Sequence, residues 1–142
     1  MATPKSIRLE FVTPERAIAH EDIDEVELPG EEGFFGVLPG HAPLLAALKT
    51  GPIWYRSGGE KHYAFVSGGF VEVTADRVSV LATVAERAED IDVARAEAAK
   101  RRAEDILSKP VLEMDTERAR IAMLRAIARL QIAQLTRPRG RS

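Results

Sequence analysis

The sequence predicts an all-β sandwich of about ten strands in residues 1–86, followed by an antiparallel two-helix hairpin in residues 87–142. Two observations support this prediction. Up to about Ala85, short runs alternate apolar and polar residues between frequent glycines, which is typical of half-buried strands joined by tight turns. From Asp92 on, Ala, Arg and Glu dominate and no glycine occurs before Gly140, which is typical of helices.

The predicted strands show a period of two. Apolar residues two positions apart mark them in chain order: Ile7, Leu9 and Phe11; Val26 and Leu28; Tyr63 and Phe65; Val71 and Val73; and Val78 to Val84, where Leu81 breaks the alternation. Ser67 precedes two glycines, and we interpret residues 66–70 as a hairpin turn rather than a nucleophile elbow. Such short strands favour a sandwich or a barrel.

The predicted helices are separated by a connector at residues 108–114 that contains Pro110. Asp92 is expected to cap the first helix, which extends to about Leu107, and Asp115 the second, which extends to about Leu135. Small residues share one face of each helix, so the two helices can pack closely and antiparallel: Ala96, Ala99 and Ala103 on the first, and Ala122, Ala126 and Ala133 on the second. The second helix has apolar surface to spare, which implies a further apolar partner.

Composition excludes several classes of function. The chain has no cysteine, a net charge of -2 and only three histidines, His20, His41 and His62, which lack metal-ligand spacing, so we expect no metal site. Its slight acidity, and a basic tail without aromatic neighbours, argue against nucleic acid. No run approaches the length of a membrane span and residues 1–10 do not resemble a signal peptide, so any membrane association requires a partner. No plausible nucleophile or acid–base pair indicates an enzyme.

Arginines form the one chemically suggestive pattern. On a helical wheel, Arg118, Arg125 and Arg129 lie within about 40° of one another, and Arg95 and Arg102 lie seven residues apart on the first helix. Guanidinium groups bind phosphate oxygens in a bidentate manner, so two folded helices could aim several of them at one anion. The alternative is a solvated face with local Glu–Arg pairs. Spacing alone leaves both interpretations open.

Several motifs in order resemble one family. They are residues 13–16 (TPER), 30–45 (GEEGFFGVLPGHAPLL), 66–73 (VSGGFVEV), 78–82 (VSVLA) and 91–96 (IDVARA). Together they resemble the epsilon subunit of F-type ATP synthases over nearly the whole chain. The resemblance implies a ten-stranded sandwich followed by a helical hairpin, and a non-catalytic rotor subunit of a proton-translocating synthase.

The resemblance also implies partners. The sandwich would contact the gamma subunit and the ring of c subunits, with Glu31, Glu32 and His41 as candidate c-ring contacts, although His41 could equally be a solvent-facing residue without a role. The hairpin would fold onto the sandwich or extend into the alpha/beta hexamer and hinder ATP hydrolysis. Ser108 and Pro110 are the expected hinge. The location implied is peripheral, at the cytoplasmic face of a bacterial inner membrane.

Some bacterial members of this family bind ATP on the folded hairpin. The matching positions are all present here: Glu86, Ile91, Asp92, Arg95, Ala96, Arg102, Arg125 and Arg129. Arg118 is not part of the family pattern. The resemblance therefore implies no required cofactor but ATP as a regulatory ligand, and the alternative function is a free-standing ATP-sensing regulatory module.

Overall fold

The computed structural model describes residues 5–110 and 112–136 and divides the chain into two compact units, residues 1–87 and 88–142. The basic tail residues Arg137, Arg139 and Arg141 lie outside the described residues, as do residues 1–4. The described residues of the first unit form eight strands: β1 (Ile7–Val12), β2 (Ala17–Ile23), β3 (Glu25–Gly30), β4 (Gly33–Val37), β5 (Leu44–Ala47), β6 (Gly51–Ser57), β7 (Glu60–Val73) and β8 (Arg77–Arg87).

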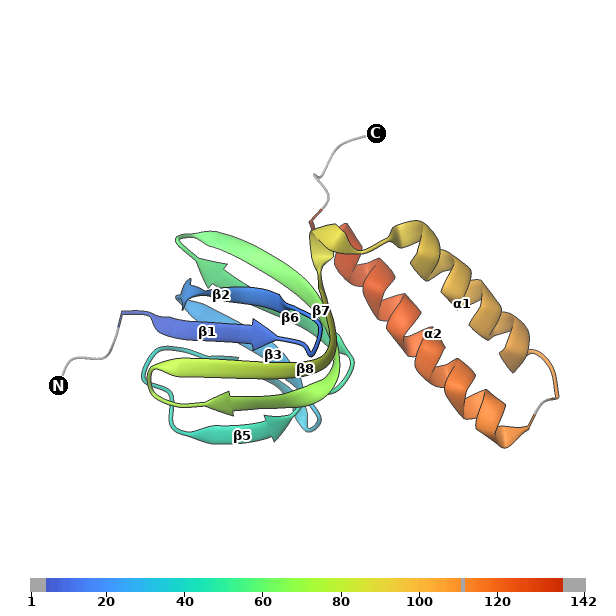
Figure 1. Cartoon of the computed structure of the whole chain (residues 1–142), viewed down its shortest axis with the longest axis horizontal. Helices are drawn as coiled ribbons and strands as arrows, with labels where there is room; N and C mark the ends of the chain where they lie inside the picture. Colours follow the sequence, from blue (N-terminus) through green and yellow to red (C-terminus); the bar gives the residue numbers. More distant parts are fainter. Residues whose placement is uncertain (1–4, 111, 137–142) are drawn as a thin grey trace. The chain divides into compact units, whose positions relative to one another are not determined.

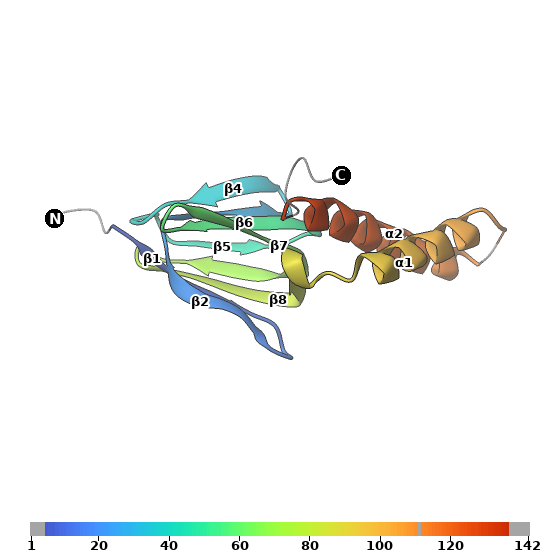
Figure 2. The same ribbon diagram turned by 90° about the horizontal axis from the view of Figure 1, so that it is seen from above.

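The strands form one hydrogen-bonded path that folds over on itself (Figures 1 and 2). Its order is β2-β1-β8-β7-β6-β3-β4, and β5 pairs with the second half of β7. Alternate residues of β1 are buried, so one face of each layer is apolar and must be covered. Residues from both ends of the path, Ile23 on β2 and Val37 on β4 among them, meet in a single core cluster. The predicted sandwich is therefore confirmed.

The structure of β7 shows that the hairpin turn predicted at residues 66–70 is wrong. Residues 66–70 are not a hairpin turn, because β7 continues through them and stays in register with β8, Ser67 opposite Val84 and Gly69 opposite Ala82. Gly68 and Gly69 have φ values of +80° and +111°, and a Cβ on Gly69 would lie 2.2 Å from the carbonyl oxygen of Leu81. The glycine pair does not form the predicted turn. It allows the backbone of β7 to approach β8 closely and to twist locally within one long strand.

The count of strands differs from the expected ten for the same reason. The first half of β7 pairs with β6 and its second half with β5, and the first half of β8 also pairs in parallel with β1. Two long strands thus take part in both layers. Tyr63 and Phe65, and Val71 and Val73, therefore mark two halves of one strand rather than two strands.

The second unit is helical. It contains a short 3-10 turn, η1 (Ala88–Asp90), and the helices α1 (Val93–Leu107) and α2 (Glu113–Gln134). Asp92 caps α1 as expected, since its Oδ1 accepts a hydrogen bond from the backbone N–H of Arg95 at 3.0 Å. The prediction that Asp115 caps the second helix is wrong, because α2 begins at Glu113 after Leu112. Asp115 lies in the first turn, where its carboxylate interacts favourably with the positive end of the helix dipole. None of the described helices is long and apolar enough to cross a membrane.

Candidate functional site

The two helices of the second unit meet through alanines. Ala96 and Ala103 are buried on α1, and Ala119 and Ala126 are buried on α2, each pair seven residues apart. One pocket is lined by residues of both helices, Ala99, Ala103 and Ile106 on α1 and Asp115, Ala119 and Ala122 on α2 among them. In an antiparallel pair, Ala103 therefore lies level with Ala119 and Ala96 with Ala126. Small side chains allow the helix axes to approach closely.

This alignment decides which of the proposed ATP-binding residues come together. Arg95 lies next to Ala96 in the sequence and Arg125 next to Ala126, so both fall at the same level of the hairpin. Asp92 lies three residues before Arg95, and Arg129 lies four residues after Arg125. In an antiparallel hairpin both therefore lie toward the same end, the end that includes buried Ile91. Arg102 lies about 10 Å further along α1, seven residues at 1.5 Å each.

Glu86 differs from the other seven residues because it belongs to the sandwich unit. It lies on β8, where its Cα partner is Phe65 on β7. The hairpin unit alone thus contains seven of the eight candidate residues, Ile91, Asp92, Arg95, Ala96, Arg102, Arg125 and Arg129.

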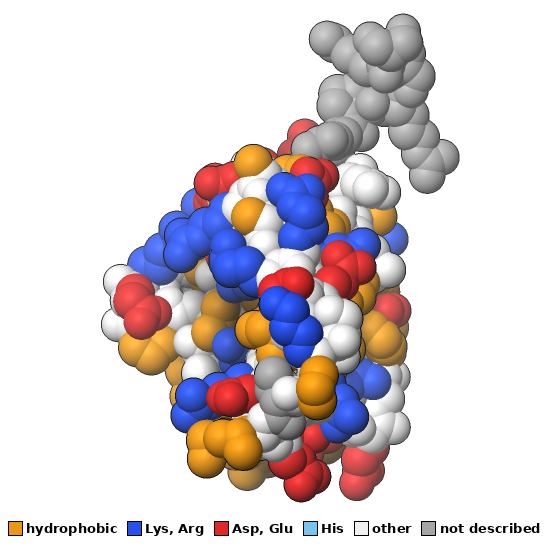
Figure 3. All heavy atoms as spheres, turned by 90° about the vertical axis from the view of Figure 1, so that its right-hand side faces the viewer, with side chains coloured by type: hydrophobic (Ala, Val, Ile, Leu, Met, Phe, Trp, Pro, Cys, Tyr) orange, Lys and Arg blue, Asp and Glu red, His pale blue; other side chains and the backbone are white. Residues whose placement is uncertain are grey.

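One local Glu–Arg pair forms on α2 at an arginine outside the candidate set, and Arg125 and Arg129 within that set also have interaction partners. Arg120 pairs with Glu117 at 2.6 Å, three residues away on α2. Within residues 5–110 and 112–136, neither Arg102 nor Arg118 has a side-chain hydrogen bond or ion pair. These two exposed guanidinium groups line the same pocket of about 400 Å³. Figure 3, which faces the hairpin, shows Lys and Arg side chains beside exposed hydrophobic ones.

The connector between the helices is stabilised at its first end. Ser108 is the C-cap of α1, and its hydroxyl donates to the carbonyl oxygen of Asp105 at 2.7 Å. Lys109 pairs with the carboxylate of Asp105 at 2.9 Å, and Pro110 follows. Proline disfavours the helical conformation in the residue before it, so α1 stops here.

Two of the three candidate c-ring residues occupy a hairpin tip on the sandwich. Glu31 and Glu32 are the only residues between the paired Gly30 of β3 and Gly33 of β4, so both exposed carboxylates project from a two-residue turn. They line a groove of about 510 Å³ whose other walls include Phe34, Leu45 and Ala47. His41 does not line this groove and bonds through its ring to the carbonyl oxygen of Ala42.

An exposed apolar row on the sandwich was not anticipated from the sequence. Phe70 on β7 and Leu81 on β8 are opposite each other and are 58% and 59% exposed. Val12 is the Cα partner of Leu81 on one side, and Ala47 is the Cα partner of Phe70 on the other. We call these four residues the apolar row. The only sequence signal for the apolar row was Leu81, which interrupts the alternation of apolar and polar residues in β8.

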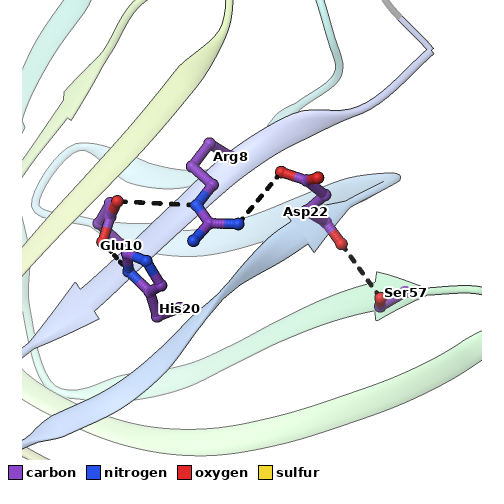
Figure 4. A network of polar contacts seen from close by, with 5 residues as sticks. All are labelled: Arg8, Glu10, His20, Asp22 and Ser57. Carbon is purple, nitrogen blue, oxygen red and sulfur yellow. Dashed lines mark hydrogen bonds and ion pairs between the residues drawn. The ribbon is translucent and has the colours of Figure 1, made fainter.

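The three histidines come from different segments of the sandwich, His20 from β2, His41 from the segment between β4 and β5, and His62 from β7. Within the part of the chain that the structure describes, no group of three His, Asp or Glu side chains is placed to hold a metal ion. His20 pairs with Glu10, Arg8 lies between Glu10 and Asp22, and the Ser57 hydroxyl donates to the Asp22 carbonyl oxygen at 3.1 Å (Figure 4). This network joins β1, β2 and β6 at the surface of the sandwich and resembles structural ion pairing.

Comparisons with known proteins agree for both units. Residues 6–88 match the family described as ATP synthase, Delta/Epsilon chain, beta-sandwich domain, and residues 89–134 match the long alpha-helix domain of the same chain. The ATP synthase epsilon chain of Nitratidesulfovibrio vulgaris strain DP4 is 50% identical over 90% of this chain and 96% of its own length. The epsilon chain of Solibacter usitatus is 48% identical over 92% of this chain and 97% of its own length. The epsilon chain of Bacillus velezensis is 45% identical over 91% of this chain and 98% of its own length.

Solved structures agree as well. A chain in the cryo-EM structure of the Euglena gracilis mitochondrial ATP synthase, which contains OSCP, F1 and the c-ring, is similar with a TM-score of 0.82 and 25% identity, covering 95% of this chain and 84% of that one. A chain from the central stalk and c-ring of the Tetrahymena thermophila enzyme shares the fold, with a TM-score of 0.60 and 16% identity over 94% and 99%. The chain therefore belongs to the epsilon-chain family of ATP synthase, whose members are non-catalytic subunits of that complex.

Proposed function

We propose that the chain is a rotor subunit of the central stalk of a bacterial, proton-translocating F-type ATP synthase, in which the sandwich couples the c-ring to gamma and the hairpin restrains ATP hydrolysis. The observation that supports this most directly is the contrast between the two units. The sandwich encloses large apolar side chains and bears two candidate contact surfaces, the apolar row and the groove at Glu31 and Glu32, which share Ala47. The hairpin packs through alanines and leaves large apolar side chains exposed.

The apolar row is the proposed contact with gamma. Phe70 and Leu81 leave more than half of their surface in water, and cross-strand pairing places them together in the middle of a layer. Contiguous exposed apolar surface marks interaction sites. A sandwich core deforms little under load, so a partner held on this row would turn together with it.

The groove below Glu31 and Glu32 is the proposed contact with the c-ring. It combines two exposed carboxylates with apolar walls, which suits a loop that offers a basic side chain between apolar ones. The same contact would hold the chain at the cytoplasmic face of the bacterial inner membrane. Its own described helices provide no membrane span. His41 is a weaker candidate for this contact because it lies outside the groove.

The hairpin is the proposed inhibitory element. Leu112, Met114, Ile121 and Leu124 on and before α2 are 49–74% exposed, so α2 has apolar surface to offer to gamma and the alpha/beta hexamer in an extended state. Ser108 and Pro110 end α1 where such an extension would hinge. ATP bound only to the folded hairpin would stabilise it by about 2.7 kcal/mol at a hundredfold excess over Kd. Plentiful ATP would then withdraw the inhibitory element by population shift.

The inhibitory function is tested by ending the chain after Arg87 in the assembled complex. The truncated subunit keeps every strand of the sandwich and is expected to assemble while ATP hydrolysis rises. Unchanged hydrolysis by a complex that contains the truncated subunit would contradict the proposal. Failure of the full chain to co-purify with gamma would instead favour a free-standing ATP-sensing module.

ATP binding is tested by calorimetry on the isolated full chain, with and without Mg²⁺. We expect binding near cellular ATP concentrations, and its loss in the double variant Arg125→Ala, Arg129→Ala. Arg120→Ala is the matched control, because Arg120 is on the same helix but pairs with Glu117. No binding at millimolar ATP would remove ATP from the proposed mechanism and leave the rotor function intact.

A further inference from the structure

Strands β7 and β8 both switch the face that they turn toward the core, and they do so at the same level of the sheet. In β7 the residues of the core cluster are even-numbered up to Val66 and odd-numbered from Val71 on. In β8 they are even-numbered up to Ala82, and the next one is Ala85. Successive side chains of a regular strand point to opposite faces, so each change of parity requires a local departure from regular strand geometry. We call this level the switch.

The glycine pair of β7 lies at the switch. The register with β8 is the same before and after the pair, so no residue is inserted and the change comes from rotation of the backbone. Gly68 and Gly69 have φ values of +80° and +111°, whereas a regular antiparallel strand has a φ of about −140°. A Cβ on Gly68 would lie 3.3 Å from the hydroxyl oxygen of Thr83. A side chain at either position would therefore strain the switch.

Hydrogen bonds hold the switch from the side opposite β8. Ser67, the residue before the pair, is only 4% exposed, and its hydroxyl oxygen lies 2.7 Å from that of Thr50, the residue before β6. The backbone N–H of Leu48 donates to the carbonyl oxygen of Gly69 at 2.9 Å. The backbone rotation is thus fixed between β8 and the segment that joins β5 to β6.

The switch decides which side chains form the apolar row. If the parity of Val66 continued along β7, Phe70 would point into the core and Val71 would point outward. Instead Phe70 is 58% exposed and Val71 is fully buried. The same change in β8 leaves Leu81 59% exposed beside the fully buried Val80. The two large side chains therefore face outward together because both strands rotate at one level.

We propose that Gly68 and Gly69 are positioning residues for the contact with gamma, because they fix the rotation of β7 that turns Phe70 outward beside Leu81. This inference rests on the proposed function of the apolar row and names the element that orients the row. The core of an interface is packed as closely as a protein interior, so a partner fits the row in one rotation only. A changed rotation should lower affinity even when the sandwich stays folded.

The first test uses the free chain, whose lack of cysteine makes a single introduced thiol a specific reporter. Phe70→Cys should react with a maleimide at least about tenfold faster than Val71→Cys, because a buried thiol reacts only after local opening. Adding Gly68→Ala should reduce that ratio at least about threefold. Gly59→Ala is the matched control, since φ is +87° there and the space around the added Cβ is open. A ratio that neither Gly68→Ala nor Gly69→Ala changes would overturn the inference.

The second test measures the affinity of the full chain for an alpha/beta/gamma complex prepared without this subunit. Gly68→Ala should bind about tenfold more weakly, and Gly59→Ala should bind within about twofold of the unchanged chain. Val26→Ala, at a fully buried position of β3, controls for lost stability because it leaves the switch intact. Circular dichroism and urea denaturation establish that each variant is folded under the binding conditions. Equal losses for folded Val26→Ala and Gly68→Ala would overturn the inference.

A double-mutant cycle separates positioning from a merely structural effect. In the background Phe70→Ala, Leu81→Ala, adding Gly68→Ala should weaken binding by less than about twofold further, because the glycine acts through the two removed side chains. Full additivity would overturn the inference. If Phe70→Ala, Leu81→Ala lowers affinity while Gly68→Ala and Gly69→Ala do not, the inference is wrong and the proposed gamma contact stands. If Phe70→Ala, Leu81→Ala leaves affinity unchanged, the proposed gamma contact is itself wrong and the inference is overturned with it.

Discussion

The sandwich and the hairpin bury different kinds of side chain. The sandwich core contains Phe11, Leu9 and Leu28 at 0% exposure, whereas the buried residues of α1 and α2 are alanines with the single exception of Ile132. Complete burial of a Leu or Phe side chain contributes about 1.5–3 kcal/mol, and each buried methyl or methylene group about 0.8 kcal/mol. The sandwich is therefore held together far more strongly for each buried residue than the hairpin.

This difference suits the proposed division of labour. A ligand contributing about 2.7 kcal/mol at a hundredfold excess over Kd cannot compete with the free energy of a large apolar core. The same ligand can decide the state of an interface between helices that is built on alanine methyl groups. Under the proposed function, a ligand would therefore shift the state of the hairpin and leave the sandwich unchanged.

The largest effect is expected in the sandwich core. Phe11→Ala should lower the free energy of unfolding of the sandwich by about 3–5 kcal/mol, because it removes a fully buried ring and leaves a cavity. Urea denaturation measures this. Leu81→Ala, at a side chain that is 59% exposed, is the control and should change stability by less than about 0.5 kcal/mol. Equal losses for the two variants would contradict the assignment of the core.

The glycine pair in β7 gives the next largest effect. Gly69→Ala should destabilise the sandwich by about 2–3 kcal/mol, because φ is +111° and the new Cβ would lie 2.2 Å from the Leu81 carbonyl oxygen. Gly59→Ala is the matched control, since φ is +87° there but nothing lies within 4 Å of the added Cβ. The difference between their denaturation midpoints isolates the steric contact. No difference would show that β7 and β8 can separate at this point without cost.

Overpacking the helix interface should affect the hairpin alone. Ala119→Leu inserts a large side chain at a position that is 3% exposed and should cost about 1–3 kcal/mol. Hydrogen exchange should show faster opening of α1 and α2 with unchanged protection in β7 and β8. Ala94→Leu, at an exposed position of α1, serves as control. A loss of protection in the sandwich would break the comparison, because the two units would then unfold together.

The N-cap of α1 separates structure from ligand binding. Asp92→Ala should destabilise α1 by about 1 kcal/mol through loss of the bond to the Arg95 N–H, whereas Asp92→Asn keeps an acceptor at the same place. Helix content measured by circular dichroism should thus fall only in the alanine variant. If ATP binding requires the carboxylate itself, calorimetry will detect a change in both variants.

The smallest effect is expected at the surface network of β1 and β2. Arg8→Ala should cost about 0.2–1 kcal/mol, because Arg8 is partly exposed and its contacts with Glu10 and Asp22 are 3.7 and 3.4 Å long. Salt should screen most of this difference in denaturation experiments. A loss above that of Gly69→Ala would mean that this network, rather than apolar burial, stabilises the sandwich.

The site was only partly accessible from the sequence. The spacing of Arg95 and Arg102, and of Arg118 and Arg125, can be read from the sequence, and it correctly places each pair on one side of a helix. Which side faces the other helix depends on the burial of the neighbouring alanines. The apolar row was missed because its members come from four separate strands, and only pairing between strands brings Phe70 beside Leu81.

The sequence by itself determined the class of fold, the division between strands and helices near Arg87, the capped start of α1 and the family, because these depend on local periodicity, local hydrogen bonds and contiguous motifs. Only the tertiary structure decided that Gly68 and Gly69 lie inside a strand rather than at a turn. Glycine permits both conformations equally well, and the choice depends on the register with β8, whose residues follow later in the chain. Long-range pairing, which no local pattern encodes, likewise brought Arg102 and Arg118 to one pocket.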